Sequence, residues 1–239
     1  MVDEVFGVVN RFFVGLQRRV QGIPRGSAQI YERLATRVIE RMYVYVARSA
    51  CSKIGFCDVV LDVGCGVGSL SMKLREFCGP QFVVGLDISR TMLRLAKKNF
   101  DRSGFRGNLD LVQGDAHAMP LRDKCFKMVL STGTLHHIRR PEEVFRECGR
   151  VLREGGTEWI YEFSFDAPEE AVRRTAKAFD KPAFLVKLVA ALHGLPRSAY
   201  SSGYIAEALS KSGVKYSVEF EDMLTKIVIS PRRPVKTFT

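Results

Sequence analysis

Residues 59–70 read Val-Val-Leu-Asp-Val-Gly-Cys-Gly-Val-Gly-Ser-Leu, which predicts a buried strand, a tight glycine loop and the start of a helix. Glycines let the backbone turn sharply and approach a ligand closely, and a helix N-terminus adds free amide groups. Gly64, Gly66 and Gly68 are spaced Gly-x-Gly-x-Gly, whereas the dinucleotide fingerprint is Gly-x-Gly-x-x-Gly. The segment therefore predicts an α/β fold with a nucleoside site that is not of the dinucleotide type.

An acid on each side of this loop narrows the choice of ligand. Asp62 would repel a pyrophosphate but suits a ligand with an ammonium or sulfonium charge. Residues 81–87 are typical of a second strand that ends in Asp87, where a carboxylate can accept hydrogen bonds from both ribose hydroxyls. Alone, Asp87 would more simply cap the helix expected over residues 89–99. Together with Asp62 and the glycines it favours S-adenosylmethionine, which carries both a ribose and a sulfonium.

Two later strands are expected to complete the ligand-binding edge of a parallel sheet. Residues 109–113 predict the third strand, and Asp115 follows at its end, where its carboxylate could reach an adenine amino group or cap a turn. Residues 126–131 predict the fourth strand, and residues 132–137 lie where a methyl group and its acceptor should meet. No Asn-Pro-Pro-Tyr or Asp-Pro-Pro-Tyr motif occurs there, which disfavours methylation of planar amino groups.

Four segments give the chain a resemblance to the class I S-adenosylmethionine-dependent methyltransferases, in particular the ubiquinone/menaquinone-biosynthesis (type 11) group. They are residues 61–68, 85–89, 113–116 and 150–156. The resemblance implies a Rossmann-like α/β fold whose seven-stranded, mostly parallel sheet has an antiparallel last strand and helices on both faces. It also implies methyl transfer from S-adenosylmethionine, with S-adenosylhomocysteine as the product.

The motifs and the resemblance together define the expected cofactor site. Its residues lie on the glycine loop, at the carboxyl ends of the strands and on one N-terminal helix. They are Asp62, Gly64, Cys65, Gly66, Gly68, Asp87, Ile88, Met92, Gly114, Asp115, Ala116, Ser131, Thr132 and Tyr31. In the resembling family the aspartate at the position of Asp115 contacts adenine, which favours that role over the turn cap.

The adjacent pair His136 and His137 supplies the catalytic candidate. One imidazole, for which we take His136, could remove a proton from an oxygen or carbon acceptor near neutral pH. The alternative is that both rings cap or pack the turn. His117 and His193 have no evident acid partner or metal-ligand partner in the sequence, so no metal site is expected. In-line placement of the acceptor behind an activated methyl group can supply effective molarities on the order of 10⁵–10⁸ M. Positioning can therefore account for most of the rate, and the identity of the acceptor leaves little trace in the sequence.

One methyltransferase domain is expected over residues 1–239, because 239 residues with 46% hydrophobic content can bury one full core. Its expected parts are an N-terminal helical lid (1–55), a cofactor-binding core (56–163), a helical insertion that shapes the acceptor pocket (164–213) and a closing strand pair (214–232). The apolar stripes of the lid and of the insertion are each also typical of ordinary core packing. If they line a pocket, Tyr31 is the lid residue expected there, and the acceptor is prenylated, aromatic or lipid-like.

Composition leaves three function classes open. The net charge of +11 suits RNA, an anionic membrane surface or an acidic substrate, and equally an ordinary solvated surface. No apolar run is long enough to cross a membrane and no secretory cleavage pattern is present, so a cytoplasmic location is expected, with the six cysteines as reduced, buried thiols. The favoured function is methylation of oxygen or carbon in a small, partly apolar molecule. An RNA methyltransferase and a cofactor-binding protein without catalysis are the alternatives.

Overall fold

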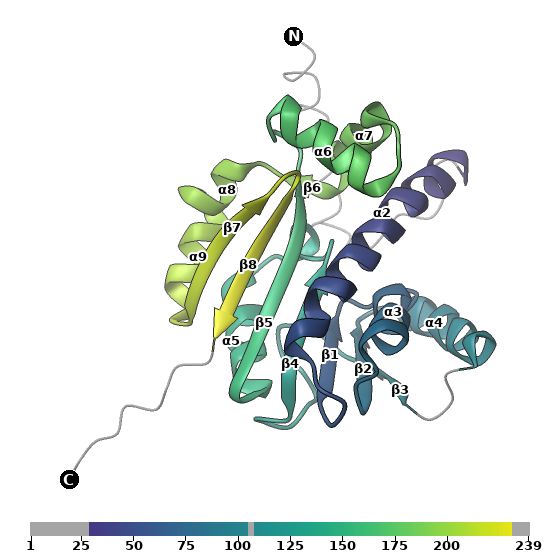
Figure 1. Ribbon diagram of the computed structural model, residues 1–239. Coiled ribbons are helices and arrows are strands. Elements are labelled where there is room, and N and C mark those ends of the chain that lie inside the picture. Colours follow the sequence, from purple (N-terminus) through teal and green to yellow (C-terminus); the bar gives the residue numbers. More distant parts are fainter. Residues whose placement is uncertain (1–28, 105–107, 231–239) are drawn as a thin grey trace.

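The computed structural model describes residues 29–104 and 108–230, with side chains from Arg37 onward. A central sheet carries helices on both faces (Figure 1). Its strands are β1 (Val59–Val63), β2 (Phe82–Asp87), β3 (Leu109–Gln113), β4 (Phe126–Thr132), β5 (Leu152–Ser164), β6 (Gly194–Leu195), β7 (Lys215–Glu221) and β8 (Leu224–Ser230). The helices are α2 (Gln29–Ala50), η1 (Cys51–Lys53), α3 (Ser69–Cys78), α4 (Arg90–Ser103), η2 (Leu135–His137), α5 (Pro141–Val151), α6 (Glu169–Phe179), α7 (Ala183–His193), α8 (Arg197–Ser201) and α9 (Tyr204–Ser212).

The strand order is β3-β2-β1-β4-β5-β8-β7, with β6 paired to the end of β5. β1 lies between β2 and β4 and runs parallel to both, while β8 is antiparallel to β5 and to β7. The carboxyl ends of β1 to β5 therefore meet at one edge of the sheet, where ligands bind in open α/β sheets. The expected α/β class, with a mostly parallel sheet and an antiparallel closing strand, is confirmed.

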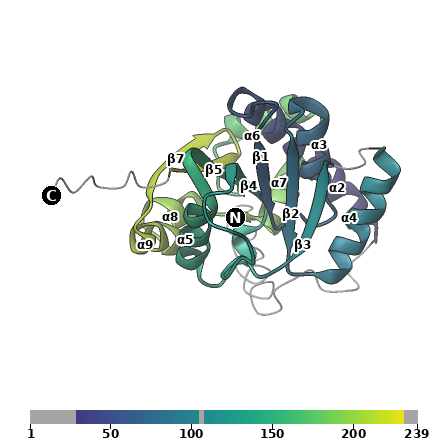
Figure 2. The same cartoon turned by 90° about the horizontal axis from the view of Figure 1, so that it is seen from below.

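The helices lie on the faces that right-handed crossovers require (Figure 2). The chain moves outward from β1 through α3 and α4 in one direction, and from β4 through α5 in the other, so these helices cover opposite faces. α2 packs beside α3, and α9 packs beside α5. Among the described residues, no helix combines the length and apolarity needed to cross a lipid bilayer.

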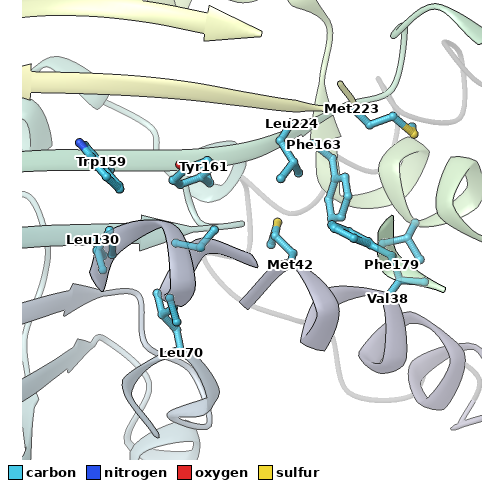
Figure 3. Close-up of a cluster of buried hydrophobic side chains, with 14 of the residues drawn as sticks. Val38, Met42, Leu70, Leu130, Trp159, Tyr161, Phe163, Phe179, Met223 and Leu224 are labelled. Atoms are coloured by element: carbon cyan, nitrogen blue, oxygen red, sulfur yellow. The ribbon is translucent and has the colours of Figure 1, made fainter. Parts of the chain in front are cut away.

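The core on the α2 face joins segments that are far apart in the sequence (Figure 3). Val38 and Met42 of α2 pack with Phe163 of β5 and Phe179 of α6. Side chains from α7 complete the cluster, whereas Phe184 at the start of α7 is 72% exposed. The apolar stripes of α2 and of the insertion therefore serve mainly as core in the described residues.

The cysteines differ from expectation. Cys51 and Cys78 form a disulfide that joins η1 to the end of α3, and Cys57 and Cys125 are exposed thiols. The expectation of six reduced, buried thiols is therefore wrong for these four, although the other two are buried and free. The disulfide left no short-spacing signal, because its two cysteines are 27 positions apart and meet only through the packing of α2 on α3.

Candidate active site

The glycine loop between β1 and α3 has a backbone that requires glycine. The φ angles are +72° at Gly64, +53° at Gly66 and +80° at Gly68, all in the left-handed region that other residues rarely adopt. A Cβ on Gly64 would lie 2.4 Å from the side chain of Thr134, so this glycine also permits close contact with the segment after β4. A Cβ on Gly66 would meet nothing within 4 Å, so the loop is open at that point.

Asp87 holds this loop from the end of β2. One carboxylate oxygen accepts a hydrogen bond from the Gly66 amide and the other from the Ser89 amide, both at 2.8 Å. The capping role at α4 belongs to Ser89, whose hydroxyl accepts from the amide of Met92 at 3.4 Å. Because each carboxylate oxygen can accept a further hydrogen bond, Asp87 can hold a ribose diol while it orders the loop.

Asp62 lies behind the loop rather than on its open side. It is 1% exposed, and its carboxylate accepts a 2.6 Å hydrogen bond from the hydroxyl of Ser71 on α3. Burial raises the pKa of Asp62 to about 7, the Ser71 hydroxyl lowers it, and Asp87 raises it further. A cationic ligand group nearby would favour the ionised form. Sequence reasoning missed Ser71, which is a polar residue on the buried side of an amphipathic helix.

Asp115 caps a turn after β3. Its carboxylate lies 2.9 Å from the amide and 2.6 Å from the Nδ1 atom of His117. Burial raises the pKa of Asp115, but the hydrogen bonds from His117 outweigh burial and lower it. The expectation that His117 has no acid partner is therefore wrong. The described residues show Asp115 in the turn-capping role, and its adenine contact stays a prediction.

The remaining expected cofactor residues lie along the same edge. Ile88 is 46% exposed beside Asp87, which leaves an apolar surface next to the expected ribose position. Gly114 is in close contact with Pro120, since a Cβ would lie 2.6 Å from its ring, and Ala116 packs against the core. Met92 is partly buried on α4. Tyr31 lies on α2, but its side chain is outside the described residues.

The end of β4 is attached to the glycine loop. The Ser131 hydroxyl donates a 3.0 Å hydrogen bond to the Val63 carbonyl at the end of β1. The Thr134 hydroxyl, which lies against Gly64, donates to the Thr132 carbonyl at 3.3 Å. Ser131 and Thr132 are both buried, so they support the site with hydrogen bonds and backbone rather than with exposed side chains.

A buried histidine and carboxylate pair lies immediately beyond this point. His136 Nδ1 is 2.9 Å from Glu162 Oε2, and the amide of Leu135 donates to Glu162 Oε1 at 2.5 Å. The His136 side chain is 0% exposed and that of Glu162 is 1% exposed. Burial raises the pKa of Glu162 to about 8, against the lowering effect of the hydrogen bond from the Leu135 amide. The sequence analysis did not identify Glu162.

Two further imidazoles surround His136. The ring centroid of His137 lies 4.1 Å away, and that of His193 on α7 lies 5.9 Å away. Burial and then the neighbouring His136 lower the pKa of His137 to about 3 and that of His193 to about 4, so both rings are neutral near pH 7. Among the described side chains, no group of three or more histidines, cysteines or acids is arranged to hold a metal ion.

Tyr43 of α2 connects the two halves of the site. Burial raises the pKa of its hydroxyl, and the next contributions come from Asp62, Cys65, Glu162 and Asp87. These groups belong to the glycine loop, the end of β2 and the end of β5, so the hydroxyl lies within electrostatic range of all three. Tyr31, the residue expected from the sequence, lies twelve positions earlier on the same helix.

Comparisons with known proteins identify similar methyltransferase sequences. Residues 61–160 match the family described as a methyltransferase domain. The chain is 32% identical over 154 residues to the ubiquinone/menaquinone biosynthesis C-methyltransferase UbiE of Roseobacter denitrificans, a match that covers 64% of this chain and 59% of the relative. It is 30% identical over 167 residues to UbiE of Escherichia fergusonii, covering 66% and 62%. The chain thus spans about three fifths of the length of these curated relatives.

Among solved structures, the fold is similar to that of a Methanococcus maripaludis protein assigned to the S-adenosyl-L-methionine-dependent methyltransferases. The TM-score is 0.65 at 19% identity, and the match covers 90% of this chain and 100% of the other. At this identity the likeness shows a shared fold.

Proposed function

We propose that this chain, whose residues 61–160 match the methyltransferase domain family, transfers a methyl group from S-adenosylmethionine to carbon or oxygen of a small, partly apolar acceptor. S-adenosylmethionine is the methyl donor that the domain family implies. The observation that carries the proposal is the hydrogen bond between Gly66 and Asp87, with the His136–Glu162 pair at the same edge of the sheet.

The described residues fit this cofactor. The open side of Gly66 leaves room for a ligand against the loop, and Asp87 can accept hydrogen bonds from a ribose. Ile88 and Asp115 are proposed to contact the adenine, and Asp62 is proposed to face the methionine end. When bound, the cofactor supplies an activated methyl group whose leaving group is a neutral thioether. Geometry then accounts for most of the rate, since the acceptor must lie in line behind the methyl group.

The acceptor is proposed to be neutral, ring-containing and able to lose a proton. The curated relatives carry the name of C-methyltransferases of ubiquinone and menaquinone biosynthesis, which favours a quinol-like ring. The neutral rings of His137 and His193 and the hydroxyl of Tyr43 suit such a ligand better than a polyanion. His136 is the proposed base, and general-base assistance typically adds about 10²–10⁴-fold to a rate.

The parts outside the matched domain are proposed to complete the acceptor side. His193 of α7 lies close to His136, which supports a contribution from the insertion at residues 164–213. Tyr43 of α2 gives similar support to the N-terminal part, residues 1–55. A cytoplasmic location also stays a prediction.

Calorimetric titration with S-adenosylmethionine tests the cofactor site. Replacement of Asp87 by Ala removes a carboxylate that accepts hydrogen bonds from both loop and ligand. Loss of hydrogen bonds to a charged group costs roughly 1.5–3 kcal/mol, so affinity should fall about 10- to 100-fold. Asp62→Ala should also weaken binding. The control is Asp101→Ala, which changes an exposed acid on α4. Unchanged affinity in folded Asp87 and Asp62 variants would contradict the site.

Methyl transfer into fractionated cell extract tests the acceptor class. Protein and labelled S-adenosylmethionine are incubated with extract, and label is counted in the RNA, protein and organic-soluble fractions at low and moderate salt. Label in the organic fraction supports the proposal. Label in RNA that declines steeply with salt would instead make the chain an RNA methyltransferase, because phosphate contacts are strongly salt-dependent. Intact cofactor binding with no label in any fraction would indicate binding without catalysis.

A further inference from the structure

Glu162 occupies an unusual position for a carboxylate. It lies on β5 next to Tyr161 and Phe163 of the core, yet its side chain points to the opposite face, toward η2. Both of its oxygens are hydrogen-bonded, Oε1 to the Leu135 amide at 2.5 Å and Oε2 to His136 Nδ1 at 2.9 Å. A buried carboxylate with two fixed partners has little freedom to turn, so the orientation of the imidazole is fixed as well.

The two partners also determine where protons lie. The backbone amide of Leu135 can only donate, so Oε1 must accept. When the carboxylate is ionised, Oε2 can also only accept, and His136 Nδ1 must then carry the proton. A neutral imidazole has a single N–H, so Nε2 is left as its basic atom.

We propose that Glu162 is the positioning residue of the methyl-transfer reaction, which keeps the proton of His136 on Nδ1 so that Nε2 takes the proton of the acceptor. This inference rests on the proposed function and adds a group to it. As the acceptor carbon or oxygen forms its bond to the methyl group, the carbon–sulfur bond breaks and its electron pair stays on sulfur. The acceptor proton passes to Nε2, and the imidazolium faces the Glu162 carboxylate until it returns the proton to water.

The other described titratable groups that face this pair carry no formal charge near neutral pH. The described titratable groups that face it are His137 of η2, His193 of α7, Tyr200 of α8 and Tyr43 of α2. Burial lowers the pKa of both imidazoles and raises that of both hydroxyls, so all four groups are neutral near pH 7. The pair therefore titrates as a unit, and entry of a further proton at low pH removes the base.

Glu158 provides a matched control on the same strand. It lies four positions earlier, and residues at even spacing on a strand share a face. Glu158 is 0% exposed, and burial raises its pKa to about 8, as it does for Glu162. Its neighbour is the thiol of Cys148 rather than an imidazole. The change Glu158→Gln therefore matches Glu162→Gln in chemistry, strand and burial, and lacks the contacts with His136 and the Leu135 amide.

Long-range ¹H–¹⁵N NMR spectra of the full chain read the tautomer directly, and four histidines make assignment practical. In the wild type near pH 8.5, His136 should carry its proton on Nδ1. In Glu162→Gln, the Leu135 amide keeps the side-chain oxygen, so the NH₂ group faces Nδ1 and the proton should move to Nε2. Glu158→Gln should give the wild-type pattern. A wild-type His136 protonated on Nε2, or an unchanged tautomer in folded Glu162→Gln, would overturn the inference.

Methyl transfer to a 1,4-naphthoquinol with a short prenyl chain supplies the second readout. Glu162→Gln should lower kcat about 10²–10⁴-fold, shift the acid limb of the kcat profile, and leave KM and cofactor affinity close to wild type. Equal kcat values and pH profiles in wild type and Glu162→Gln would refute the positioning role. Failure of the proposed function can be told apart from failure of this inference. If the proposed function is wrong, the wild type transfers no methyl group to any fraction or to the naphthoquinol. The NMR result still decides whether Glu162 sets the tautomer of His136.

Discussion

The buried carboxyl of Glu158 should make the free energy of unfolding fall as pH rises, and the substitution Glu158→Gln should remove this dependence. Burial raises its pKa from 4.5 to about 8, opposed only by the neighbouring Cys148 thiol. Above pH 4.5 the unfolded chain loses this proton, whereas the folded chain keeps it until about pH 8. The folded state therefore binds more protons in this window, and the free energy of unfolding falls as pH rises.

The size of the effect follows from the pKa difference. At roughly 1.4 kcal/mol for each pH unit, Glu158 can lower the free energy of unfolding by up to about 4 kcal/mol between pH 5 and pH 8. Glu158→Gln cannot ionise, so this slope is lost, while the contributions of Asp62 and Glu162 remain in both proteins. The difference in unfolding free energy, variant minus wild type, should rise from pH 5 to pH 8 and level off above it.

Urea unfolding under non-reducing conditions measures this difference. Trp159 is the only tryptophan and is 6% exposed, so its fluorescence reports unfolding beside the substituted position. Far-UV circular dichroism is recorded alongside, and its transition should coincide with that of the fluorescence if unfolding is two-state. Glu154→Gln, an exposed position on the same strand, is the control and should give a difference that does not vary with pH. A constant difference for Glu158→Gln across pH 5–9 would refute the reasoning.

Two further predictions concern the glycine loop and the disulfide. Gly64→Ala should lower the free energy of unfolding by more than about 2 kcal/mol, because a left-handed φ costs roughly 1–2 kcal/mol and the new Cβ meets Thr134. Gly66→Ala should lower the free energy of unfolding only by the cost of its left-handed φ, but it should weaken cofactor binding in a titration. Equal decreases in Tm for the two variants would contradict the role assigned to the Gly64–Thr134 contact. Replacing Cys51 and Cys78 by Ser should cost about 3 kcal/mol. Alkylation without reductant, followed by mass spectrometry, should leave this pair unmodified, and six alkylated thiols would disprove the disulfide.

The parts of the fold that local sequence specifies were predictable. The expected strands over 81–87, 109–113 and 126–131 agree with β2, β3 and β4 to within one residue at each end, because hydrophobic periodicity is a local signal. The helix expected over residues 89–99 differs more, since α4 continues to Ser103.

The contacts that organise the site were less predictable, because they join residues that are distant in sequence. Glu162 and His136 are 26 positions apart and meet only because β5 pairs with β4. Tyr43 reaches the site only because α2 packs against the strands of the sheet, which no local pattern encodes. A signal for Glu162 did exist, since a charged residue within the apolar stretch of residues 159–163 is costly unless it is paired.

The attachment of β4 to the glycine loop couples the proposed cofactor side of the site to the proposed acceptor side. Thr134 lies against Gly64, and His136, the proposed base, follows two positions later, so a shift of the loop on cofactor binding would also move the segment that carries His136. Affinities for donor and acceptor should therefore be coupled, and by thermodynamic linkage each ligand must change the affinity of the other by the same factor. S-adenosylhomocysteine, which lacks the methyl group but occupies the same loop, should transmit most of this coupling. Product retained on the enzyme would then set how tightly the next acceptor binds.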